Sequence, residues 1–139
     1  MTKGVFAQQP DDPLEEAVRQ MVERKVGSVV IEEPKGYPVG ILTQSDVLRG
    51  IIGGFKPNQT CRGVMSTELL TISPTADLGD ALELMREAKV KHLVVVDGEG
   101  RTAGMLSMAD VLFSAQSESD LSHIMDYLAE LKKRYTNKN

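Results

Sequence analysis

Apolar residues follow a helical period in two separate stretches of the chain. At 14–22 they recur at spacings of three and four residues, which places them on one face of an amphipathic helix. The stretch 78–85 has the same spacing. For the first helix we expect Asp12 to cap the amino terminus, with Pro13 as the first helical residue and Glu15 at capping-box spacing. The pattern therefore predicts two comparable amphipathic helices.

A continuous apolar run follows each predicted helix. Both runs are rich in β-branched residues, which is typical of a strand buried on both faces. Turn residues come next, then a second strand and a short helix. A short apolar stretch also precedes each amphipathic helix. These further elements are expected at 5–7, 28–31, 38–42 and 44–52 in the first half, and at 69–72, 93–96, 102–106 and 108–115 in the second.

The second half of this pattern repeats the first. When residues 17–48 are placed over residues 81–112, twelve of the 32 positions are identical without a gap. Two copies are too few for a solenoid, which needs three or more units. We therefore expect two halves packed around a pseudo-twofold axis. The predicted organisation is a first repeat at 1–55, a linker at 56–64, a second repeat at 65–116, and a C-terminal helix and tail at 117–139.

Composition and charge exclude several functions. The net charge of −4 gives no electrostatic footprint for nucleic acid. No apolar run reaches the length of a membrane span, and no secretory signal opens the chain. Cys61 is the only cysteine, so we expect a cytoplasmic protein without an internal disulfide. The sequence offers no nucleophile–base pair, no metal-ligand cluster and no Gly-rich phosphate loop, so we do not expect an enzyme or a metal site.

The two halves share a phrase with candidate chemistry. GILTQSDV at 40–47 and GMLSMADV at 104–111 each set a hydroxyl residue three positions before an aspartate. That spacing is typical of a capping box at the start of a helix. A helix amino terminus also binds anions, and an acid one turn later can accept both hydroxyls of a ribose. Capping alone and a nucleotide site are compatible interpretations of the same residues.

Taken together, these features resemble a tandem pair of CBS domains, named after cystathionine β-synthase. The resemblance covers about residues 1–115 and rests on three features in order: the repeat, the segment from Met65 to Pro74, and both Gly-x-Leu-Thr/Ser-x-x-Asp phrases. It implies an α+β fold of two β-α-β-β-α repeats related by a pseudo-twofold axis, followed here by a C-terminal helix. It also implies that the Thr or Ser contacts the phosphate side of an adenosine ligand and that the Asp binds its ribose.

The resemblance further implies two clefts built crosswise from both repeats. The expected ligand-binding residues of the first cleft are Ile41, Thr43, Asp46, Thr71, Ile72, Val90, Lys91 and His92. Those of the second cleft are Met105, Ser107, Asp110, Phe6, Ala7, Gly27 and Ser28. We expect the adenine to lie between aliphatic side chains and the phosphate near Lys91 and His92. Family members often carry a base just before the Asp, but Ser45 and Ala109 stand there in this chain.

Two functions from different classes remain open. The first is a regulatory module that senses energy state or metabolites by binding AMP, ADP, ATP or an S-adenosyl compound, and transmits occupancy to its own dimer or to an enzyme or transporter on another chain. Lys91 and His92 favour it. The second is a ligand-free dimerisation scaffold, which the missing base before Asp46 and Asp110 favours. We expect a homodimer in either case, with an adenosine nucleotide as the ligand of the first function and no required cofactor.

Overall fold

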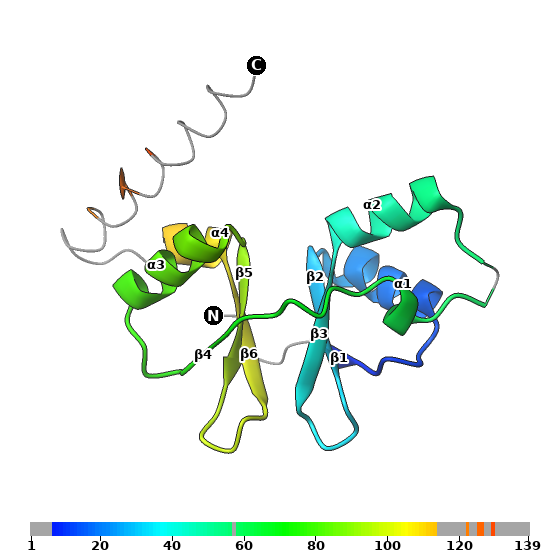
Figure 1. Cartoon of the computed structure of the whole chain (residues 1–139), viewed down its shortest axis with the longest axis horizontal. Helices are drawn as coiled ribbons and strands as arrows, with labels where there is room; N and C mark the ends of the chain where they lie inside the picture. The colour runs from blue at the N-terminus through cyan, green and yellow to red at the C-terminus, as the bar shows by residue number, and fades with distance from the viewer. Residues whose placement is uncertain (1–6, 57, 114–121, 123–124, 127–128, 130–139) are drawn as a thin grey trace.

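Two three-stranded sheets face each other across the middle of the molecule, and helices cover their outer sides (Figure 1). This computed structural model describes residues 7–56 and 58–113, with Ser122, Met125, Asp126 and Ala129. The first half contains β1 (Ala7–Gln8), α1 (Leu14–Arg24), β2 (Ser28–Glu32), β3 (Pro38–Thr43) and α2 (Gln44–Gly53). A 3-10 turn, η1 (Cys61–Gly63), follows. The second half contains β4 (Thr71–Ile72), α3 (Leu78–Ala88), β5 (His92–Val96), β6 (Thr102–Ser107) and α4 (Met108–Phe113).

The strand registers of the two halves match after a shift of 64 residues. β1 pairs in parallel with β2, with Ala7 opposite Val30, and β4 pairs with β5 in the same way, with Thr71 opposite Val94. Each hairpin is antiparallel and carries an irregularity at the same place. Lys25 and Lys89, the residues after α1 and α3, share the left-handed conformation with φ of 56° and 59°. The repeat predicted from the sequence is therefore a repeat of backbone geometry, and the α+β class is confirmed.

Three apolar clusters hold the layers together. In each half, one cluster fills the space between the sheet and its helices. The third lies between the two sheets and consists of Val30, Ile41, Val94 and Met105, with Leu69 and Val96 packed against it. Its first four members form two pairs separated by 64 residues. The central strands β2 and β5 are thus buried on both faces, as their apolar runs predict.

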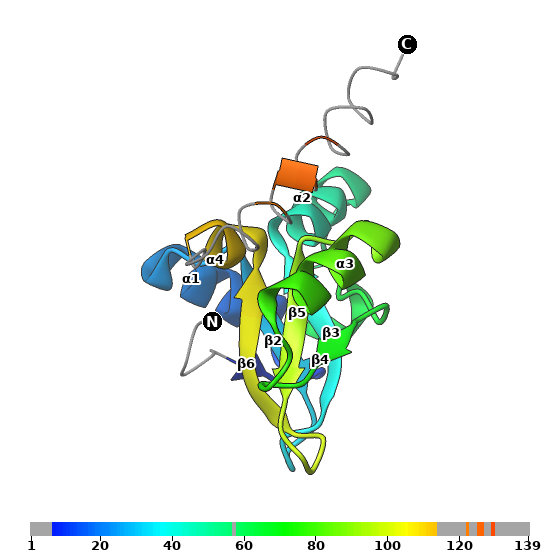
Figure 2. The ribbon, with the colours of Figure 1, turned by 90° about the vertical axis from the view of Figure 1, so that its left-hand side faces the viewer.

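Two contacts tie the repeats together at separate points. The segment after η1 runs beside β3, where Ile41 and Ser66 exchange backbone hydrogen bonds of 2.9 Å in both directions. At the hairpin tips, the backbone N–H of Thr102 donates to the carbonyl of Gly36 at 2.9 Å, and Arg101 Nε donates to the carbonyl of Lys35 at 2.9 Å. These tips lie at the end of the molecule opposite α2 and α4 (Figures 1 and 2).

The amino terminus of α1 differs from the prediction. The helix begins at Leu14, and Pro13 precedes it with ψ of 134° and no side-chain cap. The Asp12 carboxylate instead accepts the backbone N–H of Gln9 at 2.8 Å. The cause is tertiary, since Pro13 forms a β-bridge with Thr60 in the linker and is held in an extended conformation. The predicted capping box with Glu15 is therefore wrong.

Two expected elements reach the edges of the described ranges. The first strand, expected at 5–7, is described as Ala7–Gln8, and residues 1–6 lie outside the described residues. The helix expected at 108–115 is described as far as Phe113. Nearly all of the helix predicted at 117–135 also lies outside the described part of the chain.

Candidate functional site

The predicted capping box forms at the start of α2. The Asp46 backbone N–H donates to Thr43 Oγ1 at 3.3 Å, and the Thr43 N–H donates to Asp46 Oδ2 at 2.9 Å. Thr43 Oγ1 also donates to Asp46 Oδ2 at 3.0 Å. The Asp46 carboxylate is therefore fixed at a helix end where backbone N–H groups favour negative charge. Only 4% of the Asp46 surface is exposed, so both of its oxygens need partners.

Arg49 supplies the partner for the other carboxylate oxygen. It lies three residues beyond Asp46 on the same side of α2, and its Nη2 donates to Asp46 Oδ1. The two ends of this ion pair differ in exposure, because 70% of the Arg49 side chain is in solvent whereas the carboxylate is buried. The buried charge is thus compensated by a largely solvent-exposed cation.

Asp46 lies in a cleft between the two repeats with a volume of about 350 Å³. The first repeat contributes the end of β3 and the first turn of α2. The second repeat contributes the segment before β4 and the start of β5. Four basic side chains, Arg49, Lys89, Lys91 and His92, and two acidic ones, Asp46 and Glu68, line it. The remaining lining residues are Ile41, Thr43, Ser45, Ser66, Leu69, Leu70, Val90 and Val94.

The structure brings six of the eight residues predicted for this cleft to its surface: Ile41, Thr43, Asp46, Val90, Lys91 and His92. Thr71 and Ile72 do not line it. Ile72 packs against the core of the second repeat, and Thr71 is exposed. Leu69 and Leu70 line the cleft in their place. The reason is the path of the backbone, since β4 runs parallel to β5 only from Thr71 onward and the residues before it pass the mouth of the cleft.

The second repeat carries the same capping contacts as the first. Ser107 and Asp110 form a matching pair of hydrogen bonds, from Ser107 N to Asp110 Oδ2 at 3.0 Å and from Asp110 N to Ser107 Oγ at 3.2 Å. Across the pseudo-dyad, Ser28 Oγ donates to Met105 Sδ at 3.3 Å, and both residues are buried. The predicted neighbours Ser28 and Met105 are therefore in direct contact.

The other residues predicted for the second cleft lie nearby or are not described. Ala7 is paired with Val30 in β1, and the carbonyl of Gly27 accepts the N–H of Gln44 at 3.1 Å at the start of α2. Phe6 lies outside the described residues. The two repeats thus share a backbone plan but differ in the side chains at the pseudo-dyad.

His92 is half-buried and interacts electrostatically with Lys91 and Asp110 of its own repeat. Burial lowers the pKa of its imidazole below the ordinary value of 6.5, and the neighbouring Lys91 lowers this pKa further. The Asp110 carboxylate opposes these effects and raises the pKa. The pKa of His92 therefore lies below its ordinary value.

Sequence reasoning missed several residues of this cleft. Arg49 is a single charge on a helix, which normally indicates a solvated face, although its spacing from Asp46 was a usable signal. Ser66 and Glu68 reach the cleft because the segment after η1 pairs with β3 at Ser66, and no local pattern predicts that pairing. Among the described residues, no cluster of three or more His, Cys, Asp or Glu side chains is suited to hold a metal ion. No helix in the described ranges is long and apolar enough to cross a membrane.

Comparison with known proteins gives the family. The CBS domain family model matches residues 1–53 and 61–117, so the chain belongs to the CBS-domain family. It is 33% identical over 108 residues to the mitochondrial CBS domain-containing protein CBSX3 of Arabidopsis thaliana, covering 73% of this chain and 52% of that protein. It is 30% identical to an uncharacterized protein of Methanopyrus kandleri, covering 79% of this chain and 57% of the relative. The chain therefore spans little more than half the length of these two relatives.

Solved structures share the fold. The CBS domain protein PAE2072 from Pyrobaculum aerophilum, complexed with AMP, superposes with a TM-score of 0.79 at 20% identity, covering 91% of this chain and 95% of that one. The CBS domain pair of protein MJ0100, in complex with 5′-methylthioadenosine and S-adenosyl-L-methionine, gives a TM-score of 0.74 at 20% identity, with coverage of 81% and 94%. At this identity the similarity establishes a CBS-pair fold.

Proposed function

We propose that this protein is a regulatory module that binds an adenosine-containing ligand in the cleft at Asp46. One observation carries the proposal: a buried carboxylate, fixed at the start of α2, shares a cleft with Lys91 and His92 from the other repeat. A carboxylate suits a ribose diol, and the basic pair suits a phosphate. The AMP and S-adenosyl complexes of structural neighbours support the same ligand class.

The cleft has room and chemistry for such a ligand. Its volume of about 350 Å³ lies in the range of small-molecule sites. Ile41, Val90 and Leu69 offer aliphatic surface for the adenine. Lys91 and His92 line this cleft, whereas the equivalent residues for the second site, Gly27 and Ser28, carry no charge. We therefore expect unequal occupancy, with a phosphorylated adenosine in the Asp46 cleft and the Asp110 region empty or holding an uncharged nucleoside.

No chemistry is assigned to the module itself. A bound ligand would bridge the two repeats, because the cleft takes Asp46 from the first and Lys91 and His92 from the second. A ligand would therefore act by changing how the repeats are held together, and the effect would pass to a second copy or to an enzyme or transporter on another chain. The protein is in this view a non-enzymatic sensor without a required cofactor.

The test is calorimetry on Asp46→Ala with AMP, ATP and S-adenosylmethionine. Hydrogen bonds to a charged group contribute about 1.5–3 kcal/mol each, so losing the carboxylate should weaken binding about tenfold or more, at about 1.4 kcal/mol per decade. Asp110→Ala is the matched control, because it removes the equivalent cap in the second repeat. Unchanged affinity in a folded Asp46→Ala protein, or an equal loss in the Asp110→Ala control, would rule out the assignment.

A dimerisation scaffold is the second candidate, and an exposed apolar face favours it. Val22 on α1 is 71% exposed, and Leu48, Ile51 and Ile52 on α2 are 59%, 59% and 88% exposed. Beside them α1, α2 and the linker enclose a largely apolar groove of about 640 Å³. Contiguous apolar surface of this kind marks an interaction site. We infer that a second copy of the chain covers it in a closed twofold arrangement.

Sedimentation tests the dimer. Ile52→Glu should shift the protein from a dimer toward the 15.2 kDa monomer, because a buried unpaired charge opposes association. Gly98→Glu adds the same charge at a hairpin tip and should leave the dimer intact. A wild-type monomer at micromolar concentration would exclude this interface. A stable dimer that binds none of the adenosine compounds would favour the scaffold over the sensor.

A further inference from the structure

Arg49 bonds to the one oxygen of the Asp46 carboxylate that the helix cap leaves open to a ligand. Each carboxylate oxygen offers two acceptor sites. Asp46 Oδ2 already accepts the N–H and the hydroxyl of Thr43, at 2.9 and 3.0 Å, so the helix cap fills it. Asp46 Oδ1 is left with two sites, and Arg49 Nη2 bonds to one of them. In the ligand-free protein one acceptor site therefore remains.

A ribose diol needs two acceptor sites on this carboxylate. Its two hydroxyl groups can both donate to Asp46 only if the guanidinium of Arg49 leaves Oδ1. Releasing the guanidinium costs little free energy for Arg49 itself, because 70% of that side chain is in solvent and exposed ion pairs contribute little to stability. The displaced guanidinium remains in the same cleft as Lys91 and His92. It has then lost its buried partner, and the exposed Glu68 is the remaining acid of the cleft unless the ligand brings a phosphate.

We propose that Arg49 sets the preference of this cleft for phosphorylated adenosine over adenosine. This inference rests on the proposed function. In the free protein Arg49 is an internal competitor of the ribose. In the complex it exchanges the carboxylate for the ligand's phosphate, which a guanidinium binds in a matching bidentate geometry. A ligand without phosphate must displace Arg49 without compensation, whereas a nucleotide recovers the lost interaction.

The sequence around the two aspartates supports this role. Ser45 stands directly before Asp46, so the first repeat lacks a base at that position, and Arg49 provides one a helical turn further along α2. The equivalent residue of the second repeat, 64 positions later, is Phe113. The exchange is therefore specific to the Asp46 cleft. It gives a chemical basis for unequal selectivity of two sites with the same backbone plan.

Calorimetry with AMP and adenosine on Arg49→Gln tests the proposal. We expect AMP to bind about threefold to tenfold more weakly, because a charge-assisted hydrogen bond to phosphate is lost. Adenosine should bind equally well or up to about threefold more tightly, because no ion pair has to be broken. The ratio of the two affinities should thus fall about tenfold. Arg49→Lys keeps the positive charge and should restore part of the preference for AMP.

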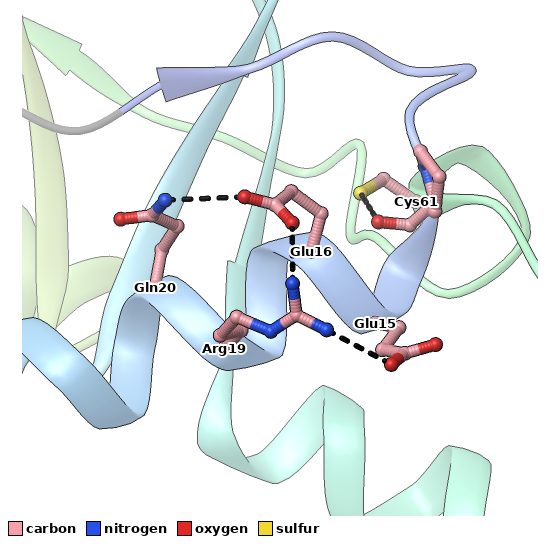
Figure 3. A network of polar contacts seen from close by, with 6 residues as sticks. Glu15, Glu16, Arg19, Gln20 and Cys61 are labelled. Atoms are coloured by element: carbon pink, nitrogen blue, oxygen red, sulfur yellow. Dashed lines mark hydrogen bonds and ion pairs between the residues drawn. The ribbon is translucent and has the colours of Figure 1, made fainter.

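Arg19→Gln is the charge-matched control. Arg19 lies on the exposed side of α1, where it pairs with Glu15 at 3.1 Å and Glu16 at 3.3 Å, and it does not line the cleft (Figure 3). Its removal changes the net charge equally and should leave the ratio unchanged. Thermal melting should show both variants folded, because Arg49 and Arg19 are largely exposed.

The outcomes separate this inference from the function on which it rests. Suppose that AMP binds and that Asp46→Ala weakens its binding. If Arg49→Gln then changes the affinities for AMP and adenosine by the same factor, Arg49 does not set the selectivity, and only this inference fails. An equal fall of the ratio in Arg19→Gln would overturn it as well, since the effect would be general electrostatics. If the wild-type protein binds neither compound, both the inference and the proposed function fail. The inference is supported if Arg49→Gln weakens the binding of AMP and strengthens the binding of adenosine.

Discussion

Gly40→Ala should destabilise the junction between the first repeat and the linker. A Cβ atom at this position would lie 2.9 Å from the backbone oxygen of Ser66 and 2.9 Å from Met65 Sδ. The methionine side chain can move aside. The Ser66 oxygen has little freedom, because it accepts the N–H of Ile41 at 2.9 Å and the same residue donates back to the Ile41 carbonyl at 2.9 Å. The added methyl group therefore has to push a hydrogen-bonded strand away from β3.

The magnitude follows from overpacking and from those two hydrogen bonds. An extra methylene in a filled space costs about 1–3 kcal/mol, and a weakened backbone hydrogen bond adds about 0.5–1.5 kcal/mol. We expect a loss of about 2–3 kcal/mol in the free energy of unfolding. For a chain of this length the melting temperature should fall by about 5–10 °C. Because Ser66 also lines the Asp46 cleft, AMP affinity should fall together with stability.

Calorimetric or circular-dichroism melting measures this effect, with Gly98→Ala as the control. Gly98 has open space around its Cβ position, and its φ does not lie in the left-handed region. That variant should melt like the wild type or slightly higher, since alanine restricts the unfolded chain. The reasoning would be refuted if Gly40→Ala melted within about 1 °C of the wild type, a shift far below the expected loss.

Two further predictions concern titratable side chains. Burial and Lys91 lower the pKa of His92, while Asp110 raises it. His92 is therefore neutral in the free protein at pH 7, and AMP binding should strengthen as the pH falls below 6.5. The AMP phosphate itself titrates, with a second pKa of about 6, and comparing the AMP affinities of wild type and His92→Gln cancels that effect. The prediction would be contradicted if the wild type did not bind AMP increasingly more tightly than His92→Gln as the pH falls. Burial raises the pKa of Cys61 to about 11, with a smaller contribution from Asp12, and the buried Sγ contacts the Pro13 carbonyl oxygen at 4.0 Å (Figure 3). The thiol should resist Ellman's reagent at pH 8 in the native protein and react at once in guanidinium; rapid reaction of the folded protein would refute that environment.

Local patterns predicted those features that depend on neighbouring residues. The capping box of Thr43 and Asp46 forms as its spacing indicates, and the apolar runs become the buried strands β2 and β5. The matched registers also follow from the repeat, because similar sequences fold into similar units.

Contacts between distant segments set the limits of prediction from the sequence. Asp12 fails as a cap because Thr60, far along the chain, holds Pro13 in an extended conformation. Leu69 and Leu70 line the cleft, close along the chain to Ser66, which pairs with Ile41 of β3. Ser28 and Met105 belonged to one predicted cleft, but only the structure shows that they contact each other directly.

The hairpin tips join the two repeats at one end of the molecule. Gly36 and Thr102 are held together at one end, whereas Asp46 and Lys91 face each other toward the other end, beyond the apolar cluster between the sheets. The Ile41–Ser66 bridge joins the repeats at a second place, so rotation of one repeat against the other is restrained at both. The helices α2 and α4 lie at the end of the molecule away from the tips (Figure 1). A rotation about the tips would displace these helices more than the strand ends beside the tips.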